Sequence, residues 1–434
     1  MTNHTLPGLS KTQVERILAA VDEGFGRETA FLQALVREPS TRGNERSAQD
    51  LVEREMRARG LEIDRFLIDP AAAKEHPGFS PITASYENAW NVVGYRRSRH
   101  GGGRSLALNA HLDVVPPANS RFWSRDPFSG HVEGDWLYGR GAGDMKAGMA
   151  ANLFALDALE AAGIHLKGDV HIQSVIEEEI TGNGAAMALA RGHRADAILI
   201  PEPTDERLVR ANVGVLKFAV TLRGVPAHPR DIGSGISAID AGMAMIEHLR
   251  RLEARWIVEK QKYPLFADLA NPIALNIGTF QGGEWQASVS CECRLEGRMG
   301  FYPGEDARAR AREFEQFVAQ CAREDAKLAR AEPQVEWIGH VHGGYEQPPG
   351  TEAEAVLQHA AELALGKPIP GYVMSAYLDA AIFALHAGMP AFTYGPVAEN
   401  VHGIDERVSL SSLRRVTKIM ALFIAGWCGV AEGA

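Results

Sequence analysis

The chain has 434 residues, enough for two or three domains and a large buried core. Its 45% hydrophobic and 23% charged residues are typical of a globular protein. The net charge is −10 and no stretch is concentrated in basic residues, so neither nucleic acid nor an anionic membrane is expected as a partner. No apolar run approaches the length of a membrane span.

Residues 1–15 contain no basic stretch followed by an apolar one, so no signal peptide is predicted and the expected compartment is the cytoplasm. The four cysteines form no disulfide framework, which fits a reducing compartment. Cys291 and Cys293 would face the same side of a strand. No second pair of cysteines or histidines stands at zinc-finger spacing, so both are interpreted as small apolar strand residues.

The first half of the chain alternates between helical and strand patterns. Helices are predicted at about 11–37, 44–59, 148–162 and 184–191. Strands are predicted at 61–64, 90–95, 105–110, 169–176 and 197–200. Residues 69–86 carry three prolines and are expected to form a loop. This alternation indicates an α/β fold with a mixed, mostly parallel sheet flanked by helices.

The pattern changes near Val213. Strands are predicted at 215–223, 273–280, 288–297 and 335–338, with helices at 237–252 and 307–329. The order β-α-β-β-α-β is that of a ferredoxin-like α+β unit. We expect this unit, residues 213–339, to be a lid and dimerisation domain inserted into a catalytic domain of residues 1–212 and 340–434. The last part is predicted to add helices at 351–365 and 380–387, a strand at 391–394 and a final helix.

The most informative residues are His111 and Asp113, which follow the apolar run at 105–108. They are expected at the end of a buried strand, where the active sites of open α/β sheets lie. A neutral imidazole is a good zinc ligand, and a carboxylate two residues later can orient its other ring nitrogen. Taken alone, the pair is also compatible with a structural histidine.

A glycine-rich segment precedes Asp144. Gly139, Gly141 and Gly143 permit positive backbone dihedrals and close approach to a ligand. A phosphate site is disfavoured because the segment has neither the dinucleotide-binding spacing nor the end of a phosphate-binding loop. The alternatives are a plain turn and a loop that aims Asp144 inward, where one carboxylate can bridge two cations.

Further acidic residues also follow apolar strands. Glu177, Glu178 and Glu179 would repel one another at a buried strand end, so they need cations, a raised pKa or both. A solvated acidic turn is the alternative. Glu202 stands between two prolines after another apolar strand, and His402 comes late in the chain. Because the candidates follow strand ends or glycine loops of one α/β layer, together they predict a two-metal hydrolase.

The combination resembles the zinc amidohydrolase and metallopeptidase family that contains acetylornithine deacetylase, succinyl-diaminopimelate desuccinylase, aminoacylase-1 and glutamate carboxypeptidase. The signatures occur in the family's order, and the resemblance covers nearly the whole chain. They are His111-x-Asp113-Val-Val-Pro, Gly139-Arg140-Gly141-x-x-Asp144-Met145-Lys146, Glu177-Glu178-Glu179, Glu202-Pro203-Thr204 and His402.

The resemblance implies two divalent metal ions. His111 and Glu202 would bind the first, Glu179 and His402 the second, and Asp144 would bridge both. Zinc suits this mixed nitrogen and oxygen ligand set, and manganese or cobalt could also occupy it.

The resemblance also implies catalytic roles beside the metals. Asp113 would orient His111, and Glu178 would be the general base on the attacking water. Two cations would lower the pKa of that water and polarise the scissile carbonyl. A neighbouring carboxylate that is not a ligand could then move the proton to the leaving amine.

In the inserted domain, His228 matches a family histidine that stabilises the oxyanion, often across a dimer interface, so a homodimer is expected. Arg298 matches a family arginine that can hold a substrate carboxylate, and Asn276 is a further candidate substrate contact. An exposed loop histidine and a surface ion pair are the alternatives for His228 and Arg298. The family commonly has a proline a few residues after this histidine and often one at Ser290, and both are missing here. These departures concern the substrate contacts and not the metal centre.

We therefore expect a metal-dependent amidohydrolase that cleaves an N-acyl amino acid or a related small amide. Dipeptidase, carboxypeptidase, N-carbamoyl hydrolase and aromatic-amine hydrolase activities could use the same site. A non-catalytic metal-stabilised binding protein is a different class, and the presence of Glu178 argues against it.

Overall fold

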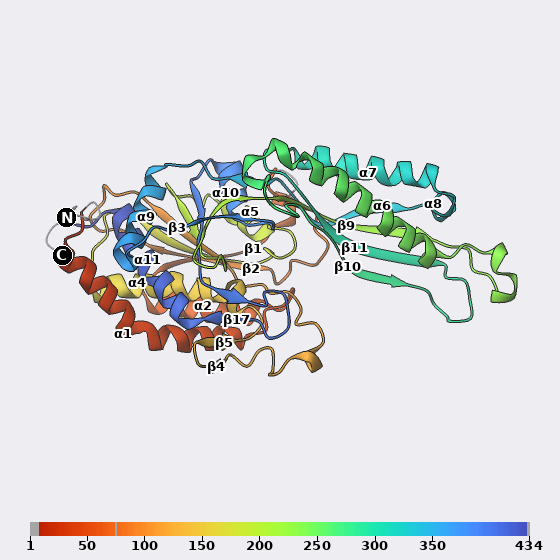
Figure 1. Ribbon diagram of the computed structural model, residues 1–434. Helices are drawn as coiled ribbons and strands as arrows, with labels where there is room; N and C mark the ends of the chain where they lie inside the picture. Colours follow the sequence, from red (N-terminus) through yellow and green to blue (C-terminus); the bar gives the residue numbers. More distant parts are fainter. Residues whose placement is uncertain (1–7, 74–75, 432–434) are drawn as a thin grey trace.

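The structure is a computed structural model that describes residues 8–73 and 76–431. It has a larger body and an elongated second unit that extends from it (Figure 1). Among the described residues, no helix combines the length and the apolar character needed to cross a membrane.

A six-stranded sheet forms the centre of the larger body. In spatial order its strands are β1 (Glu62–Leu67), β2 (Trp90–Arg96), β6 (Val170–Val175), β3 (Leu106–His111), β7 (Ile198–Ile200) and β15 (Ala391–Thr393). The four strands from β6 to β15 run parallel, whereas β1 and β2 pair antiparallel with their neighbours. This confirms the mostly parallel sheet predicted from the alternation of strands and helices.

Helices cover both faces of this sheet, so β3 and β6 are buried along their whole length. In Figure 1, α2 (Arg46–Ala58) and α4 (Ala147–Ala161) lie on one side of the sheet, with α5 (Asn183–Ala190) and α10 (Ala380–Ala387) on the other. α1 (Lys11–Val36) and α11 (Leu410–Cys428) pack against α4, and α9 (Glu352–Leu365) packs against α11. Ser10 caps the N-terminus of α1, and its side chain forms a reciprocal capping box with Gln13.

The second unit is an antiparallel sheet with helices on one face. Its strands, in spatial order, are β10 (Leu275–Gly282), β11 (Glu292–Phe301), β9 (Gly214–Arg223) and β12 (Gln334–His342). Its main helices are α6 (Ala238–Val258), α7 (Ala307–Glu324) and α8 (Ala326–Ala331). The order of elements is the predicted β-α-β-β-α-β. The single helix predicted at 307–329 is divided because the backbone of Asp325 is extended and its side chain caps α8.

We propose that this second unit is the inserted domain expected at 213–339, although its last strand, β12, runs three residues past that limit to His342. The rest of the chain would then form the catalytic domain expected at 1–212 and 340–434.

Two small sheets are not predicted by the sequence. One contains β13 (Tyr345–Glu346), β8 (Leu208–Asn212) and β14 (Gly371–Met374), and the other contains β16 (Ala398–Glu399), β17 (Arg407–Ser409), β5 (Trp136–Tyr138) and β4 (His131–Glu133). Strands this short do not establish an alternating pattern, and most of their partners are distant in sequence. The predicted loop at 69–86 also contains a short helix, α3 (Pro70–Ala73).

Glu28 is a buried carboxylic acid between α1 and α11, with 1% of its surface exposed. Its Oε1 lies 2.6 Å from Oγ1 of Thr417, and the same hydroxyl donates to the carbonyl oxygen of Leu413 at 3.0 Å. Burial raises the pKa of Glu28 to about 8, with the contact to Thr417 opposing the shift. The Thr417 hydroxyl has only one hydrogen, so a protonated Glu28 that donates to Oγ1 satisfies both contacts.

The raised pKa makes stability depend on pH. The folded chain keeps this proton up to about pH 8, whereas the unfolded chain loses it near pH 4.5. Between these values the free energy of unfolding should fall with rising pH by about 1.4 kcal/mol per unit from this group. Glu28→Gln should remove that contribution, so urea denaturation should give similar stabilities at low pH and a more stable variant near pH 8. The same slope in both proteins would contradict this prediction.

Candidate active site and metal centre

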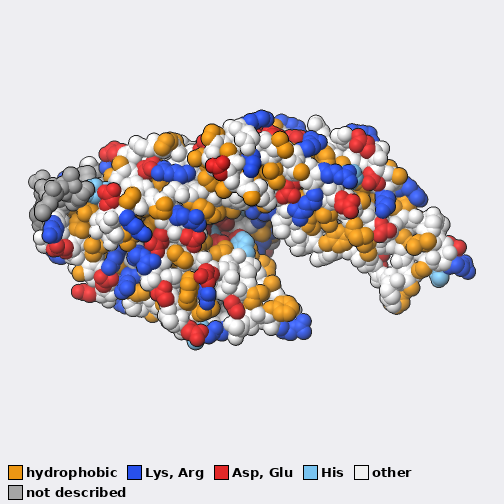
Figure 2. Space-filling model, viewed as in Figure 1, with side chains coloured by type: hydrophobic (Ala, Val, Ile, Leu, Met, Phe, Trp, Pro, Cys, Tyr) orange, Lys and Arg blue, Asp and Glu red, His pale blue; other side chains and the backbone are white. Residues whose placement is uncertain are grey.

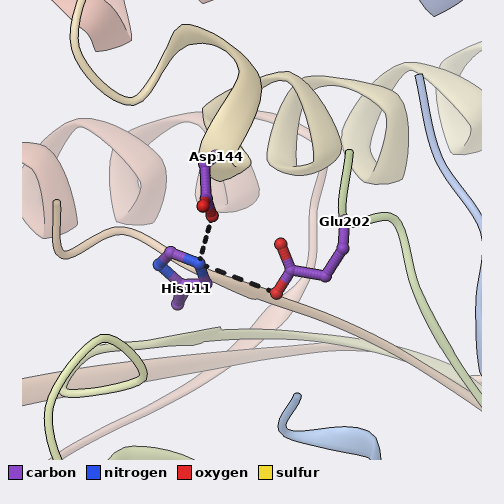
Figure 3. A group of neighbouring side chains, drawn as sticks. All are labelled: His111, Asp144 and Glu202. Atoms are coloured by element: carbon purple, nitrogen blue, oxygen red, sulfur yellow. Dashed lines mark hydrogen bonds and ion pairs between the residues drawn. The ribbon is translucent and has the colours of Figure 1, made fainter. Parts of the chain in front are cut away.

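The carboxyl ends of neighbouring strands bring the candidate residues to one edge of the central sheet. His111 is the last residue of β3, Glu177 and the next two glutamates follow β6, and Glu202 follows β7. These strands are parallel, so their carboxyl ends meet at the same edge. Figure 3 shows His111, Asp144 and Glu202 close together, with Asp144 coming from the turn before α4.

Five predicted ligands form two groups that share Asp144. Nε2 of His111 lies 3.1 Å from Oδ1 of Asp144 and 3.6 Å from Oε1 of Glu202. Nε2 of His402 lies 3.3 Å from Oδ2 of Asp144 and 3.1 Å from Oε1 of Glu179. Within each group, one donor atom from every residue lies within 4.8 Å of the others, so each group could hold one cation.

The chemistry of these groups fits divalent cations. Glu202 is 3% exposed, and its Oε1 has no hydrogen-bond partner among the described residues. Burial raises the pKa of Glu202 well above its ordinary value, and the charge of Glu179 raises the pKa of His402 to about 11. A buried carboxylate without a partner and a histidine beside clustered carboxylates both favour a cation nearby. Imidazole and carboxylate together form a ligand set suited to zinc or manganese.

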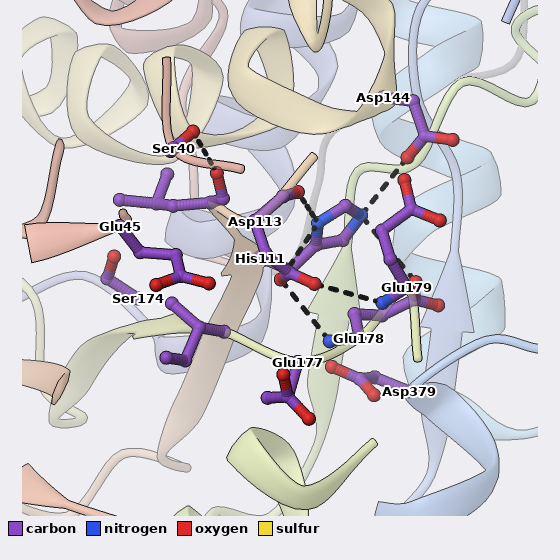
Figure 4. A network of polar contacts seen from close by, with 12 residues as sticks. Ser40, Glu45, His111, Asp113, Asp144, Ser174, Glu177, Glu178, Glu179 and Asp379 are labelled. Atoms are coloured by element: carbon purple, nitrogen blue, oxygen red, sulfur yellow. Dashed lines mark hydrogen bonds and ion pairs between the residues drawn. The ribbon is translucent and has the colours of Figure 1, made fainter. Parts of the chain in front are cut away.

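Asp113 holds both His111 and the loop after β6. The closest acceptor to Nδ1 of His111 is the carbonyl oxygen of Asp113, at 2.9 Å, while Oδ1 of its carboxylate is 3.5 Å away. The carboxylate accepts hydrogen bonds from the backbone N–H groups of Glu178 and Glu179, at 3.2 and 3.1 Å (Figure 4). Asp113 therefore positions the imidazole and two glutamates at once.

The three adjacent glutamates do not share one environment. Arg42 donates to Glu177 through Nε and Nη2, at 2.5 and 2.8 Å, and the hydroxyl of Tyr86 donates at 2.7 Å. Glu177 also has a φ of 70°, a left-handed conformation in which the backbone turns sharply. Glu177 thus anchors the loop and does not join the ligand groups. Nothing in the sequence pairs Arg42 or Tyr86 with it.

Glu178 lies beside the ligand groups but belongs to neither. Its Oε2 is 3.9 Å from Nε2 of His111. Burial raises the pKa of Glu178 well above its ordinary value, with the charge of His111 opposing the shift and that of Glu202 adding to it. A buried carboxylate with a raised pKa is suited to accept a proton and return it.

A cavity of about 720 Å³ lies between the larger body and the second unit. Figure 2 shows this recess, with histidine and acidic side chains at its floor. Asn276 of β10 and Arg298 of β11 line the opposite wall and are paired in register. Burial lowers the pKa of Arg298, and its Nη2 donates to the carbonyl oxygen of Ser375 at 3.0 Å. The structure therefore brings both predicted substrate contacts to the cavity that holds the acidic groups.

His228 is not brought to this cavity within one chain. It lies at the start of a short 3-10 turn in the second unit, is exposed, and accepts a hydrogen bond at Nδ1 from the backbone N–H of Arg230 at 3.0 Å. The sequence could not determine this placement, because the motif around His228 is local and its distance from the site depends on how the two units are arranged.

Two further polar residues near the site are not indicated by the sequence. Lys217 of β9 lines the cavity, and its Nζ donates to the backbone carbonyl oxygen of Glu179. Asp379 is 1% exposed and accepts a hydrogen bond from the Tyr377 hydroxyl at 2.9 Å. Burial raises the pKa of Asp379 to about 7. Each residue stands alone in an otherwise apolar stretch, so neither belongs to a recognisable motif.

The glycine-rich segment does not present its backbone N–H groups to a ligand. Those of Gly141, Gly143 and Asp144 donate instead to the carboxylate of Glu406. Gly143 is required by close packing, since a Cβ there would lie 2.5 Å from that of Ala398. The segment is thus a tightly packed turn that positions Asp144.

Comparison with known proteins places the chain in a family. The family model described as peptidase family M20/M25/M40 matches residues 107–426. An N-formyl-4-amino-5-aminomethyl-2-methylpyrimidine deformylase of Halalkalibacterium halodurans is 27% identical over 96% of this chain and 97% of its own. An enzyme of the same name from Bacillus subtilis is 31% identical over 78% of this chain and 83% of its own.

A solved structure of the dipeptidase Dug1p from Saccharomyces cerevisiae has the same fold. It is 13% identical, with a TM-score of 0.79 over 96% of this chain and 99% of that one. The chain therefore belongs to the peptidase family M20/M25/M40 and is a hydrolase that acts on amide bonds.

Proposed function

We propose that the enzyme hydrolyses a small N-acylated amine or amino acid and releases a carboxylate and a free amine. The observation that carries this proposal is the pair of ligand groups sharing Asp144, with Glu178 beside them in one cavity. The two deformylases match most of this chain, which supports a short acyl group.

Each of the two ligand groups would hold one divalent cation. The residues that would hold the cations are His111, Asp144, Glu179, Glu202 and His402. We favour zinc, with manganese or cobalt as alternatives. When bound, the cations supply Lewis acidity, which polarises a carbonyl group and lowers the pKa of water.

The chain's own residues would transfer the proton, orient the ligands and bind the substrate. Glu178 takes a proton from the attacking water on its carboxylate and returns it to the leaving nitrogen. Asp113 keeps the ring of His111 oriented throughout. Arg298, whose guanidinium lines the opposite wall, would pair with a negatively charged substituent of the substrate, and Asn276 beside it would hydrogen-bond the substrate.

His228 would act from a second copy of the chain. It is remote from the cavity of its own chain, and most of the large apolar side chains exposed on the described surface lie on the second unit. Examples are Met243, Val258, Phe280 and Trp285. An exposed apolar surface of this kind favours association with another subunit. We therefore propose a homodimer in which His228 stabilises the partner's oxyanion, and we propose the cytoplasm as its compartment.

A substrate panel tests the proposed function. The chelator-treated chain, reloaded with zinc or manganese, would be incubated with N-formyl, N-acetyl and N-succinyl amines, N-carbamoyl amino acids and dipeptides, and the released amine measured. Chelator-sensitive turnover of one N-acyl class supports the proposal. Turnover confined to dipeptides would select the alternative supported by the shared fold of the dipeptidase. No turnover of any compound by the metal-loaded chain would contradict both.

Glu178→Gln should lower kcat by at least about a thousandfold, because the amide cannot accept the proton. The bound metal should remain at two ions per chain, since Glu178 belongs to neither ligand group. Both quantities can be measured on one preparation, by a kinetic assay and by elemental analysis. Loss of metal would show that Glu178 is a ligand, and a nearly unchanged rate would exclude it as the base.

His228→Ala should also be nearly inactive, and mixing it with Glu178→Gln should restore activity. Random pairing of the two variants creates some sites in which a wild-type Glu178 meets a wild-type His228 from the other subunit, so roughly a quarter of the wild-type rate is expected after equal mixing and subunit exchange. The assay is turnover of the mixture against each variant alone. Failure of complementation in mixtures shown to contain heterodimers would mean that His228 does not act across the interface.

A further inference from the structure

Glu406 is a fully buried carboxylate that none of the proposed catalytic roles uses. It is 0% exposed, and its neighbours satisfy it with four hydrogen bonds. Backbone N–H groups of Gly141, Gly143 and Asp144 donate to it at 3.1, 3.0 and 3.1 Å, and Nη1 of Arg140 donates at 2.5 Å. The carboxylate therefore fixes the turn that presents Asp144.

Arg140 joins this turn to the loop that carries His402. Its Nη2 donates to the carbonyl oxygen of Gly403 at 2.9 Å, while Nη1 holds Glu406. The backbone N–H of Gly139 also donates to the carbonyl oxygen of Glu406, at 2.9 Å. With 1% of its surface exposed, Arg140 is as deeply buried as its partner. The ion pair thus connects two loops, and each loop carries one proposed ligand of the second cation.

The His402 loop needs such support. Asn400, His402 and Asp405 have φ values of 55°, 62° and 56°, a left-handed conformation that is uncommon for residues other than glycine, although asparagine, histidine and aspartate adopt it more often than most. Residues in this region persist only where the surrounding structure holds them. His402 is half exposed at its side chain, so packing alone does not fix it.

Stability alone is a weak reason for a buried ion pair, because apolar residues of similar volume often serve equally well. Geometry is a better reason here. Both terminal nitrogens of Arg140 are bonded, Glu406 accepts four hydrogen bonds, and the pair links the backbones on either side of the gap between Asp144 and His402. That gap, 3.3 Å between Oδ2 and Nε2, is where a cation shared by the two would lie.

We propose that Arg140 and Glu406 are positioning residues that set the spacing of Asp144 and His402 and thereby the affinity of the second metal position. This inference rests on the proposed function only in assuming that the two ligand groups bind cations. It concerns the group of Asp144, Glu179 and His402 more than the group of His111, whose imidazole is fixed by β3 and Asp113.

The test is titration of the metal-free full-length chain with Co²⁺, followed by visible absorption and calorimetry. Removal of a residue that orients a ligand typically lowers metal affinity about 10- to 100-fold. Glu406→Gln, which keeps the shape of the side chain, should weaken the second equivalent of Co²⁺ by this factor and the first equivalent less. Arg140→Lys should do the same, because an ammonium cannot span Glu406 and the Gly403 carbonyl at once.

Glu354→Gln is the matched control. Glu354 also accepts from a guanidinium, that of Arg210, and from a backbone N–H, that of Gly350 at 3.0 Å, but it lies in the first turn of α9 and is not part of the site. The control should change thermal stability without changing either Co²⁺ affinity.

Wild-type affinity for the second equivalent in Glu406→Gln or in Arg140→Lys would overturn the inference. An equal loss of affinity in Glu354→Gln would overturn it too, because the effect would then be general destabilisation. A wild-type chain that binds fewer than two Co²⁺ ions would instead contradict the proposed function, and this outcome is visible before any variant is compared.

Discussion

At the carboxyl edge of the central sheet, Asp144, Glu178, Glu179 and Glu202 line one cavity together with His402. The four carboxylates repel one another when they are charged, and burial removes the water that would screen this repulsion. Other groups hold three of the four segments that carry these residues in place. Asp113 binds the loop after β6 from one side, and the bidentate contact of Arg42 with Glu177 binds it from another. The buried pair of Arg140 and Glu406 secures the turn of Asp144 and the loop of His402. The arrangement of the candidate ligands therefore depends on these anchoring contacts as well as on the ligands themselves.

The second unit contributes to the same restraint. Lys217 of β9 donates to the backbone carbonyl oxygen of Glu179, and the backbone N–H of His340 in β12 donates to the carbonyl oxygen of Ile180 at 2.8 Å. Nε2 of His342 lies 2.9 Å from the carbonyl oxygen of Thr181. All three contacts fall on the loop that carries Glu178 and Glu179. The geometry of the site is thus linked to the position of the second unit, whose sheet also forms the far wall of the cavity.

The sequence predicts the parts of the fold that local pattern determines. The apolar runs before His111, Glu177 and Glu202 identify buried strands, and their parallel order brings these residues to one edge, so the two ligand groups follow from strand ends and glycine turns. The anchors could not be predicted in this way. Arg42 and Glu177 are far apart in the chain, as are Arg140 and Glu406, and an isolated arginine gives no sign of its partner. The remoteness of His228 could not be predicted either, since it depends on the arrangement of two units.

The position of the edge strand β15 affects the order in which the chain can fold during synthesis. Ala391 pairs with Ile198 of β7, so the whole second unit lies between two strands that are neighbours in the central sheet. During synthesis β7 emerges early and remains an open sheet edge until β15 arrives, and open edges are sites of misassociation. His402 and Glu406 emerge later still. A nascent chain therefore cannot assemble the proposed second metal position until His402 has left the ribosome. The second unit, whose strands and helices are continuous in sequence, has the opportunity to fold before then.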